Sequence, residues 1–208
     1  MKIAVVGATG RTGRQVAGQA LARGHDVLAL ARHPEALPGR GPSLASAAAD
    51  VLDRAAVAEA LAGSDAVVSA LGIGASRQPT VVYSGGTANV LRAMGAHGIR
   101  KLAVISAVPV GPRAGQPFLQ RHLIIPVLER VFGASYDDMR RMEAVLRGSD
   151  LDWVCLRPPR LVSGTWRERV PCPSRASGRT AAGHNRPVTV GAPPNGDQPA
   201  ARPSKQAA

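Results

Sequence analysis

The stretch KIAVVGATGRTG, residues 2–13, decides the fold class, because it joins a short apolar strand to a glycine-rich turn. Its run of Ile and Val after a single lysine is typical of a buried parallel strand. Residues 14–23 continue as an amphipathic helix, whose inner face carries Val16, Ala17, Ala20 and Leu21. A second apolar strand, DVLALA, follows at residues 26–31. A strand, a helix and a strand in about thirty residues predict a right-handed parallel crossover.

The same alternation continues along the chain. Further strands are expected at 44–50, 65–70, 101–106 and 151–156, and helices at 53–63, 87–97, 117–132 and 135–147. Asp53 is a helix N-cap, and Gly63 and Gly98 are typical helix ends. The inner face of the last helix is expected to carry Met139, Met142 and Leu146. Strands that alternate with helices predict an α/β fold with a doubly wound parallel sheet, a Rossmann fold.

The pattern stops near Gly164, so we expect a domain over residues 1–164 and an irregular tail over 165–208. The tail holds seven prolines among its 44 residues and shows neither helical nor strand periodicity. This composition is typical of disorder. Two interpretations stay open: a natural disordered tail, or an aberrant C-terminus produced by a frame change in the coding sequence.

Charge and composition bound the possible partners. The formal net charge is +12, and the tail supplies +5 of it through seven Arg or Lys against two acids. No nucleic-acid motif accompanies this charge, so nucleic acid is not expected as a partner. Cys155 and Cys172 have no metal-ligand spacing, and Cys155 is expected to be a small buried hydrophobe. With neither a secretory segment nor a membrane span, a cytoplasmic protein is expected; the oligomeric state stays open.

The turn after the first strand has the chemistry of a phosphate-binding loop. Its spacing is G-x-x-G-x-x-G, with Gly7, Gly10 and Gly13, and it also contains Thr9, Arg11 and Thr12. The first glycine allows the sharp turn, the second lets a pyrophosphate approach, and the third lets helix and strand pack closely. The helix N-terminus then presents free N–H groups to the phosphates. The context, between an apolar strand and an amphipathic helix, predicts a dinucleotide site.

The residues after the second strand favour NADP(H) over NAD(H). An NAD site needs a carboxylate at the end of this strand, but Asp26 stands at its beginning. Arg32 occupies the end instead, and Arg11 approaches from the glycine loop. Two guanidinium groups there would bind a 2′-phosphate through charge-assisted hydrogen bonds. The alternative is that both are solvated surface arginines.

These residues resemble the atypical short-chain dehydrogenase/reductase superfamily, in particular its NAD(P)H-binding group with flavin/biliverdin reductase-like and NmrA-like proteins. The resemblance covers residues 1–164 and is carried by VVGATGRTG at 5–13, Arg32, DVLD at 50–53, SALG at 69–72 and LDWVCLRPPRL at 151–161. It implies that Asp50 and Val51 border the adenine. It also implies that Ala70, Leu71 and Gly72 line the adenosine side. Ser106, Arg157 and Pro158 would then lie near the nicotinamide.

The catalytic residues follow from the same resemblance. Fully equipped members use a tyrosine with a lysine four residues later; here Tyr136 is followed at that spacing by Arg140, with Glu143 in a family-like position. Arginine keeps the charge but lacks the compact, tunable ammonium of lysine. Tyr136 is therefore a candidate acid or a helix packing residue. Ser106 is a candidate hydrogen-bond donor to substrate or nicotinamide, or a structural serine at a strand end.

The expected function is an NADPH-dependent oxidoreductase that reduces a small conjugated acceptor such as a flavin, a quinone or a carbonyl. Such small-molecule acceptors need little acid catalysis, and neither a metal nor a membrane is expected to take part. The alternative is a non-catalytic redox sensor that binds NADP(H), as in NmrA-like relatives, which the missing lysine favours. A sugar-nucleotide epimerase is less favoured, because it would need a substantial C-terminal substrate domain.

Overall fold

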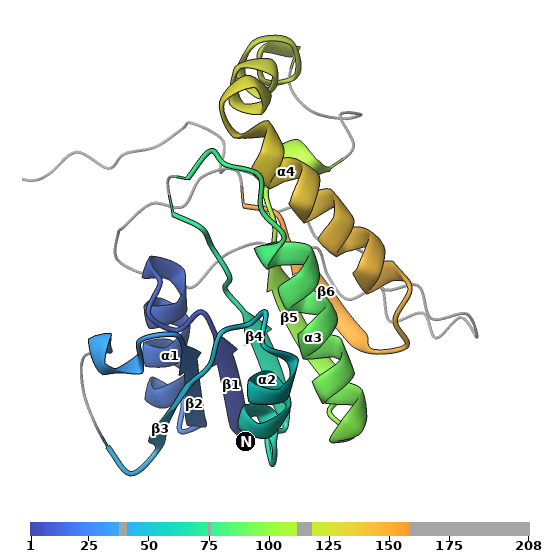
Figure 1. Ribbon diagram of the computed structural model, residues 1–208. Coiled ribbons are helices and arrows are strands. Elements are labelled where there is room, and N and C mark those ends of the chain that lie inside the picture. The colour runs from blue at the N-terminus through green and yellow to red at the C-terminus, as the bar shows by residue number, and fades with distance from the viewer. Residues whose placement is uncertain (38–40, 75, 112–117, 159–208) are drawn as a thin grey trace, which may run out of the picture.

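The computed structural model describes residues 1–37, 41–74, 76–111 and 118–158, and every structural statement below concerns these residues. Six strands form one parallel sheet in the order β3-β2-β1-β4-β5-β6 (Figure 1). The strands are β1 (Lys2–Val6), β2 (Asp26–Ala31), β3 (Leu44–Ala48), β4 (Ala66–Ser69), β5 (Lys101–Ile105) and β6 (Asp152–Leu156). The expected doubly wound Rossmann architecture is confirmed.

Helices cover both faces of this sheet. The described helices are α1 (Arg11–Ala22), α2 (Arg54–Leu61), α3 (Val82–Ala96) and α4 (Ile125–Arg147), with a π-helical turn over Gln120–Ile124 before α4. Right-handed crossovers that run in opposite directions from β1 place their helices on opposite faces. Accordingly α3 lies between α2 and α4 on one face, and α1 packs against β1 and β2 on the other (Figure 1).

The hydrophobic core is divided between the two faces. The larger cluster lies under α2, α3 and α4 and includes Val67, Val90, Met94, Leu102 and Leu146. The smaller cluster lies under α1 and consists mainly of valines and alanines: Val5, Ala8, Ala17, Ala20, Val27 and Ala29. Small side chains let α1 approach the sheet closely, which brings its N-terminus near the end of β1.

Most expected elements are confirmed within a few residues. Asp53 is the N-cap of α2 and accepts hydrogen bonds from the N–H groups of Ala55 and Ala56. One expectation was wrong: helix α3 begins at Val82, five residues before the expected start. The two helices expected at 117–132 and 135–147 correspond to the two parts of α4 on either side of a kink at Phe132, and α4 itself begins at Ile125, after the π-helical turn. The expected tail, 165–208, lies outside the described residues.

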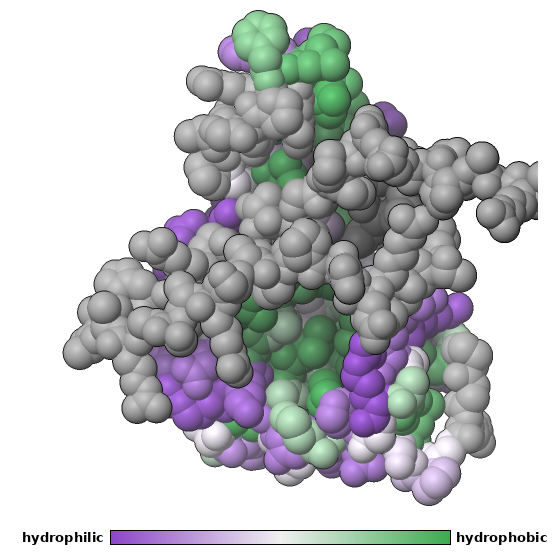
Figure 2. Space-filling model, turned by 180° about the vertical axis from the view of Figure 1, so that it is seen from behind, coloured by the Kyte–Doolittle hydropathy of each residue, from purple (hydrophilic) through white to green (hydrophobic). Residues whose placement is uncertain are grey.

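A shallow groove of about 360 Å³ lies on the sheet face that carries α1. Its apolar floor includes Ile3, Val68, Ala103 and Val154, and Figure 2 shows it as a hydrophobic hollow between polar areas. The lining also includes Lys101 and Asp152, which are the first residues of their strands. The groove therefore lies away from the carboxyl ends of the strands, where ligands bind in this kind of sheet.

Candidate cofactor and active site

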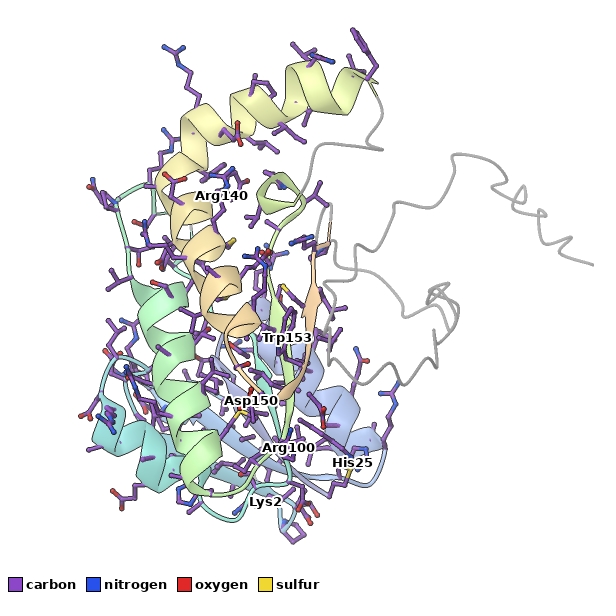
Figure 3. The ribbon with its side chains drawn as sticks, turned by 90° about the vertical axis from the view of Figure 1, so that its right-hand side faces the viewer. Lys2, His25, Arg100, Arg140, Asp150 and Trp153 are labelled. Atoms are coloured by element: carbon purple, nitrogen blue, oxygen red, sulfur yellow. The ribbon has the colours of Figure 1, made fainter. Side chains whose placement is uncertain are left out.

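The direction of chain progression reverses between β1 and β4, so a crevice is expected at the carboxyl ends of these two strands. All cofactor-binding residues expected from the sequence follow the carboxyl end of a strand. They are Gly7, Thr9, Gly10, Arg11, Thr12 and Gly13 after β1, Arg32 after β2, Asp50 and Val51 after β3, Ala70, Leu71 and Gly72 after β4, and Arg157 and Pro158 after β6. The labelled residues Lys2, His25, Arg100 and Asp150 lie at the opposite, amino end of the sheet (Figure 3).

The glycine loop is shaped by close backbone contacts. Gly7 has φ +78°, and a Cβ there would lie 2.8 Å from the carbonyl oxygen of Ala70. A Cβ on Gly13 would lie 2.2 Å from the carbonyl oxygen of Gly7, so only glycine lets α1 pack against the loop. No side chain caps the N-terminus of α1, whose N-cap is Gly10, and its first turn holds no acid. This cradle fits the phosphates of a dinucleotide, because open N–H groups and the helix dipole favour an anion.

The loop is fixed to the second strand, which brings the two candidate arginines to one edge. The N–H groups of Gly7 and Ala8 both donate to the carbonyl oxygen of Leu30, at 2.9 and 3.2 Å. Arg32 follows two residues later, and Arg11 is the first residue of α1; both are exposed. Within the described residues, Arg32 forms neither an ion pair nor a hydrogen bond. Positive charge rather than a carboxylate therefore follows the end of β2.

The adenosine side is built from the turns after β3 and β4. Val51 is buried, and Asp50 is exposed and accepts a hydrogen bond from the N–H of Leu52 at 2.9 Å. Ala70 is buried against Gly7, Leu71 is half-buried and Gly72 is exposed. The turn after β3 and the turn after β4 meet at α3, where a Cβ on Gly86 would touch both Val51 and Leu71.

A buried ionic network occupies the carboxyl ends of β5 and β6. Ser106 Oγ donates to Glu143 Oε1 at 2.8 Å, and Arg157 Nε donates to the same oxygen at 2.8 Å. A second guanidinium nitrogen of Arg157 donates to Oε2 of Glu143. All three side chains are at least nine-tenths buried, so the ion pair between Glu143 and Arg157 is shielded from solvent. Ser106 and Arg157 are therefore held by α4 beside the expected nicotinamide position.

The same network sets the protonation of its members. Burial alone would raise the pKa of the Glu143 carboxyl, but the hydrogen bonds from Arg157 and Ser106 and the charge of Arg157 hold this pKa below its usual value. Burial and the nearby Glu143 carboxylate raise the pKa of the Cys155 thiol to about 12. Cys155 is fully buried, as expected for a small core residue, and is protonated at neutral pH.

Tyr136 is half-buried on α4, and its surroundings differ from those of a tyrosine–lysine pair. Arg140 is held at 2.7 Å by both Glu129 and Asp137, so two carboxylates compensate its charge. Burial and the charge of Glu129 raise the pKa of the Tyr136 phenol. Glu129 and Arg140 lie on opposite sides of the kink in α4, and Figure 3 shows Arg140 at this bend. Arg140 therefore links the two parts of the kinked helix α4 and does not lower the pKa of Tyr136.

Sequence reasoning missed two residues that shape the site, Asp138 and Asn89. Asp138 is fully buried and accepts hydrogen bonds from the N–H groups of Tyr83 and Ser84 at 2.9 and 3.4 Å, and also from the Ser84 hydroxyl. It thereby caps α3 from a position 55 residues away in the chain. Asn89 joins α3 to the turn after β3. Neither carries a local sequence signal, because both act across elements.

Within residues 1–37, 41–74, 76–111 and 118–158, there is no group of three or more His, Cys, Asp or Glu side chains that could hold a metal ion. None of the described helices is long and apolar enough to cross a membrane.

Comparison with known proteins identifies the family. Residues 7–182 match the model of the NAD(P)H-binding family, which is most of the chain, so the protein belongs to this family. The NAD(P)H-binding group that was expected from the sequence is confirmed. With the glycine cradle, this membership defines a Rossmann domain that binds a nicotinamide dinucleotide.

Relatives named as reductases are found at modest identity. A (4-alkanoyl-5-oxo-2,5-dihydrofuran-3-yl)methyl phosphate reductase of Streptomyces griseus is 32% identical over 78% of this chain and 49% of its own length. A 3-diazoavenalumate denitrifying reductase of a Streptomyces species is 29% identical over 76% of this chain and 55% of its own. The chain thus spans about half the length of these curated relatives. It matches only 12% of an uncharacterised Mycobacterium tuberculosis protein, at 35% identity over 51% of this chain.

Solved structures share the fold. An oxidoreductase from Lactococcus lactis superposes with a TM-score of 0.63 at 21% identity, covering 76% of this chain and 68% of that one. A short-chain dehydrogenase/reductase from Veillonella parvula, solved in complex with NADP, gives a TM-score of 0.62 at 15% identity with the same coverage of each chain. At these identities the likeness establishes the Rossmann fold alone.

Proposed function

We propose that the protein is an NADP(H)-dependent reductase that transfers a hydride to a small conjugated acceptor. The observation that carries the cofactor preference is the position of Arg32 and Arg11 at the carboxyl ends of β2 and β1, with Asp26 at the far end of β2. Guanidinium groups bind phosphate bidentately, whereas a carboxylate at this place would repel the 2′-phosphate.

The bound dinucleotide would supply the hydride, and the protein would supply binding and orientation. The N–H groups at the start of α1 would hold the pyrophosphate, and the Arg11 and Arg32 side chains would hold the 2′-phosphate. Ser106 and Arg157, fixed by Glu143, would border the reacting end. Because Ser106 already donates to Glu143, its oxygen is expected to accept rather than donate toward a ligand.

A conjugated acceptor is favoured by the state of Tyr136. Its raised pKa makes it a weak proton donor, and Arg140 is compensated by two carboxylates. Flavins, quinones and conjugated carbonyls spread the incoming charge and can take their proton from water. The two Streptomyces relatives are named as reductases of small molecules, which agrees with this class of reaction.

The second candidate is a non-catalytic NADP(H) sensor of the NmrA-like type. The same compensation of Arg140 favours it, because such a protein needs cofactor binding without proton transfer. The two functions differ in turnover: a reductase oxidises NADPH when an acceptor is added, and a sensor does not.

The test measures binding and turnover on the same preparation. Fluorescence titration should give tighter binding of NADPH than of NADH, and Arg32→Ala should weaken NADPH binding by about tenfold while leaving NADH unchanged. Arg23→Ala, which removes the same charge at the other end of α1, should change neither. A panel of FMN, menadione and a conjugated ketone then tests turnover. Equal affinity for NADH and NADPH would overturn the preference, and tight binding without oxidation would select the sensor.

A further inference from the structure

The turn after β3 is attached to α3 by one side chain. Asn89 Nδ2 donates to the carbonyl oxygens of Val51 and Leu52, at 3.0 and 3.1 Å. Asn89 is nine-tenths buried, and its own Oδ1 accepts a hydrogen bond from Arg92 at 3.4 Å. The other hydrogen bonds of this turn do not reach α3: those from Leu52 and Asp53 to Asp50 are internal to the turn, and Asp53 accepts from Ala55 and Ala56 as the N-cap of α2.

Gly86 stands three residues earlier on the same face of α3 and controls how closely the turn approaches. A Cβ on Gly86 would lie 2.8 and 2.9 Å from the two γ-methyl groups of Val51 and 3.1 Å from Leu71 Cδ1. Val51 is branched at Cβ and buried, so a change of rotamer cannot relieve both short contacts. Because Gly86 has no side chain, Val51 and Leu71 can occupy the space beside it.

The helix that carries both residues is itself fixed in place. Asp138 caps its first turn from α4, and Val90 and Met94 are fully buried in the core beneath it. Helix α3 lies between α2 and α4 (Figure 1), and contacts with both neighbours hold it there. A turn attached to this helix therefore has a defined position, whereas without the hydrogen bonds from Asn89 it would open more often.

We propose that Asn89 and Gly86 are positioning residues for the adenine half of the cofactor. Asn89 holds the Asp50–Asp53 turn against α3, and Gly86 lets Val51 and Leu71 form the wall beside the adenine. This inference rests on the proposed NADP(H) function, and it adds that recognition of the adenine is separable from recognition of the nicotinamide. Substitutions of Asn89 and Gly86 should then weaken the binding only of ligands that contain an adenine.

The experiment compares NADPH with reduced nicotinamide mononucleotide, which lacks the adenosine half. Asn89→Leu and Gly86→Ala should each weaken NADPH binding by about tenfold and leave binding of the mononucleotide unchanged. In the double variant Gly86→Ala/Val51→Ala the lost methyl groups give room to the new one, so it should recover part of the affinity that Gly86→Ala loses. Met94→Ala is the control for stability: it leaves a cavity under the last turns of α3, and should lower the thermal midpoint without changing the ratio of the two affinities.

Hydrogen exchange gives a readout that needs no ligand. The amides of residues 51–53 should exchange faster in Asn89→Leu than in the wild type, while those of β1 keep their protection. Equal weakening of both nucleotides, or unchanged exchange in the turn, would overturn the proposal. If the wild type binds neither nucleotide, both the proposed function and the adenine role are wrong. Faster exchange in Asn89→Leu would then show only that Asn89 holds the turn in place.

Discussion

The hydroxyl of Ser106 donates a hydrogen bond to Glu143 Oε1 at 2.8 Å, although the two residues are 37 positions apart. Ser106 follows β5 and Glu143 lies on α4, so this bond joins a sheet edge to the helix that covers it. Arg157, which follows β6, binds the same carboxylate. Glu143 therefore fixes two residues beside the expected nicotinamide position, and its removal should affect stability as well as the site.

Glu143→Gln should destabilise the protein strongly, because it leaves the guanidinium of Arg157 buried without a compensating charge. Breaking a buried ion pair in this way costs about 3–5 kcal/mol in the free energy of unfolding. The double variant Glu143→Leu/Arg157→Met should lose less, since no charge remains buried. Arg147→Ala is the matched control: Arg147 approaches Glu143 at 3.5 Å from an exposed position, and its loss should cost no more than about 1 kcal/mol. Urea unfolding of the four proteins measures these differences, and a Glu143→Gln variant as stable as Arg147→Ala would contradict the argument.

The pH dependence of stability follows from the direction of the Glu143 shift. Its pKa in the folded protein lies below the ordinary value of 4.5, so the folded state binds fewer protons than the unfolded state in this range. The contribution to stability is therefore complete above 4.5 and is lost as the pH falls through the lower, folded-state pKa. Urea midpoints measured between neutral and acid pH should fall more steeply in the wild type than in Glu143→Gln. Parallel profiles would show that Glu143 does not titrate as described.

Several features of the site could be predicted from the sequence because their signals are local. The glycine spacing, the β-branched strand before it and Arg32 after β2 all lie within about thirty residues, and the structure places them as expected. The start of α3 could not be predicted in this way. The pair Gly85–Gly86 opposes helix formation locally, and the cap that compensates comes from Asp138 on α4. The boundary expected between 132 and 135 matches the kink in α4 at Phe132, but the Glu129–Arg140 ion pair that spans the kink could not be predicted, because it joins side chains eleven residues apart.

Asp138→Asn should therefore destabilise the protein by about 1–3 kcal/mol, because the buried carboxylate that caps α3 loses its charge and the neutral amide accepts weaker hydrogen bonds. Its neighbour provides the control. Asp137 is exposed and pairs with Arg140 at 2.7 Å, so Asp137→Asn should cost no more than about 1 kcal/mol. Thermal unfolding followed by circular dichroism compares the two variants. Similar midpoints would mean that Asp138 does not determine where α3 begins.

The Cys155 thiol should be inert in the folded protein. Its pKa of about 12 leaves almost no thiolate at pH 8, and the sulfur is fully buried on β6. A Cys172→Ser variant makes Cys155 the single cysteine of the chain, so a chromogenic disulfide reagent reports on it alone. The thiol should react only after urea is added, at the rate of unfolding. Rapid reaction in native buffer would show that β6 opens readily.

Gly13→Ala should prevent cofactor binding, because the new methyl group would lie 2.2 Å from the carbonyl oxygen of Gly7 and 2.8 Å from Ala8 Cα. Both neighbours are backbone atoms, so the strain can be relieved only by moving α1 away from the loop that should receive the phosphates. Overpacking of this kind costs about 1–3 kcal/mol in stability. Gly18→Ala is the matched control on the same helix: nothing lies within 4 Å of its Cβ position, and the change should stabilise the protein by about 0.5–1 kcal/mol. NADPH titration of both variants completes the test, with binding expected in Gly18→Ala and lost in Gly13→Ala. Retained affinity in Gly13→Ala would mean that the close contact between α1 and the glycine loop is not needed to hold the cofactor.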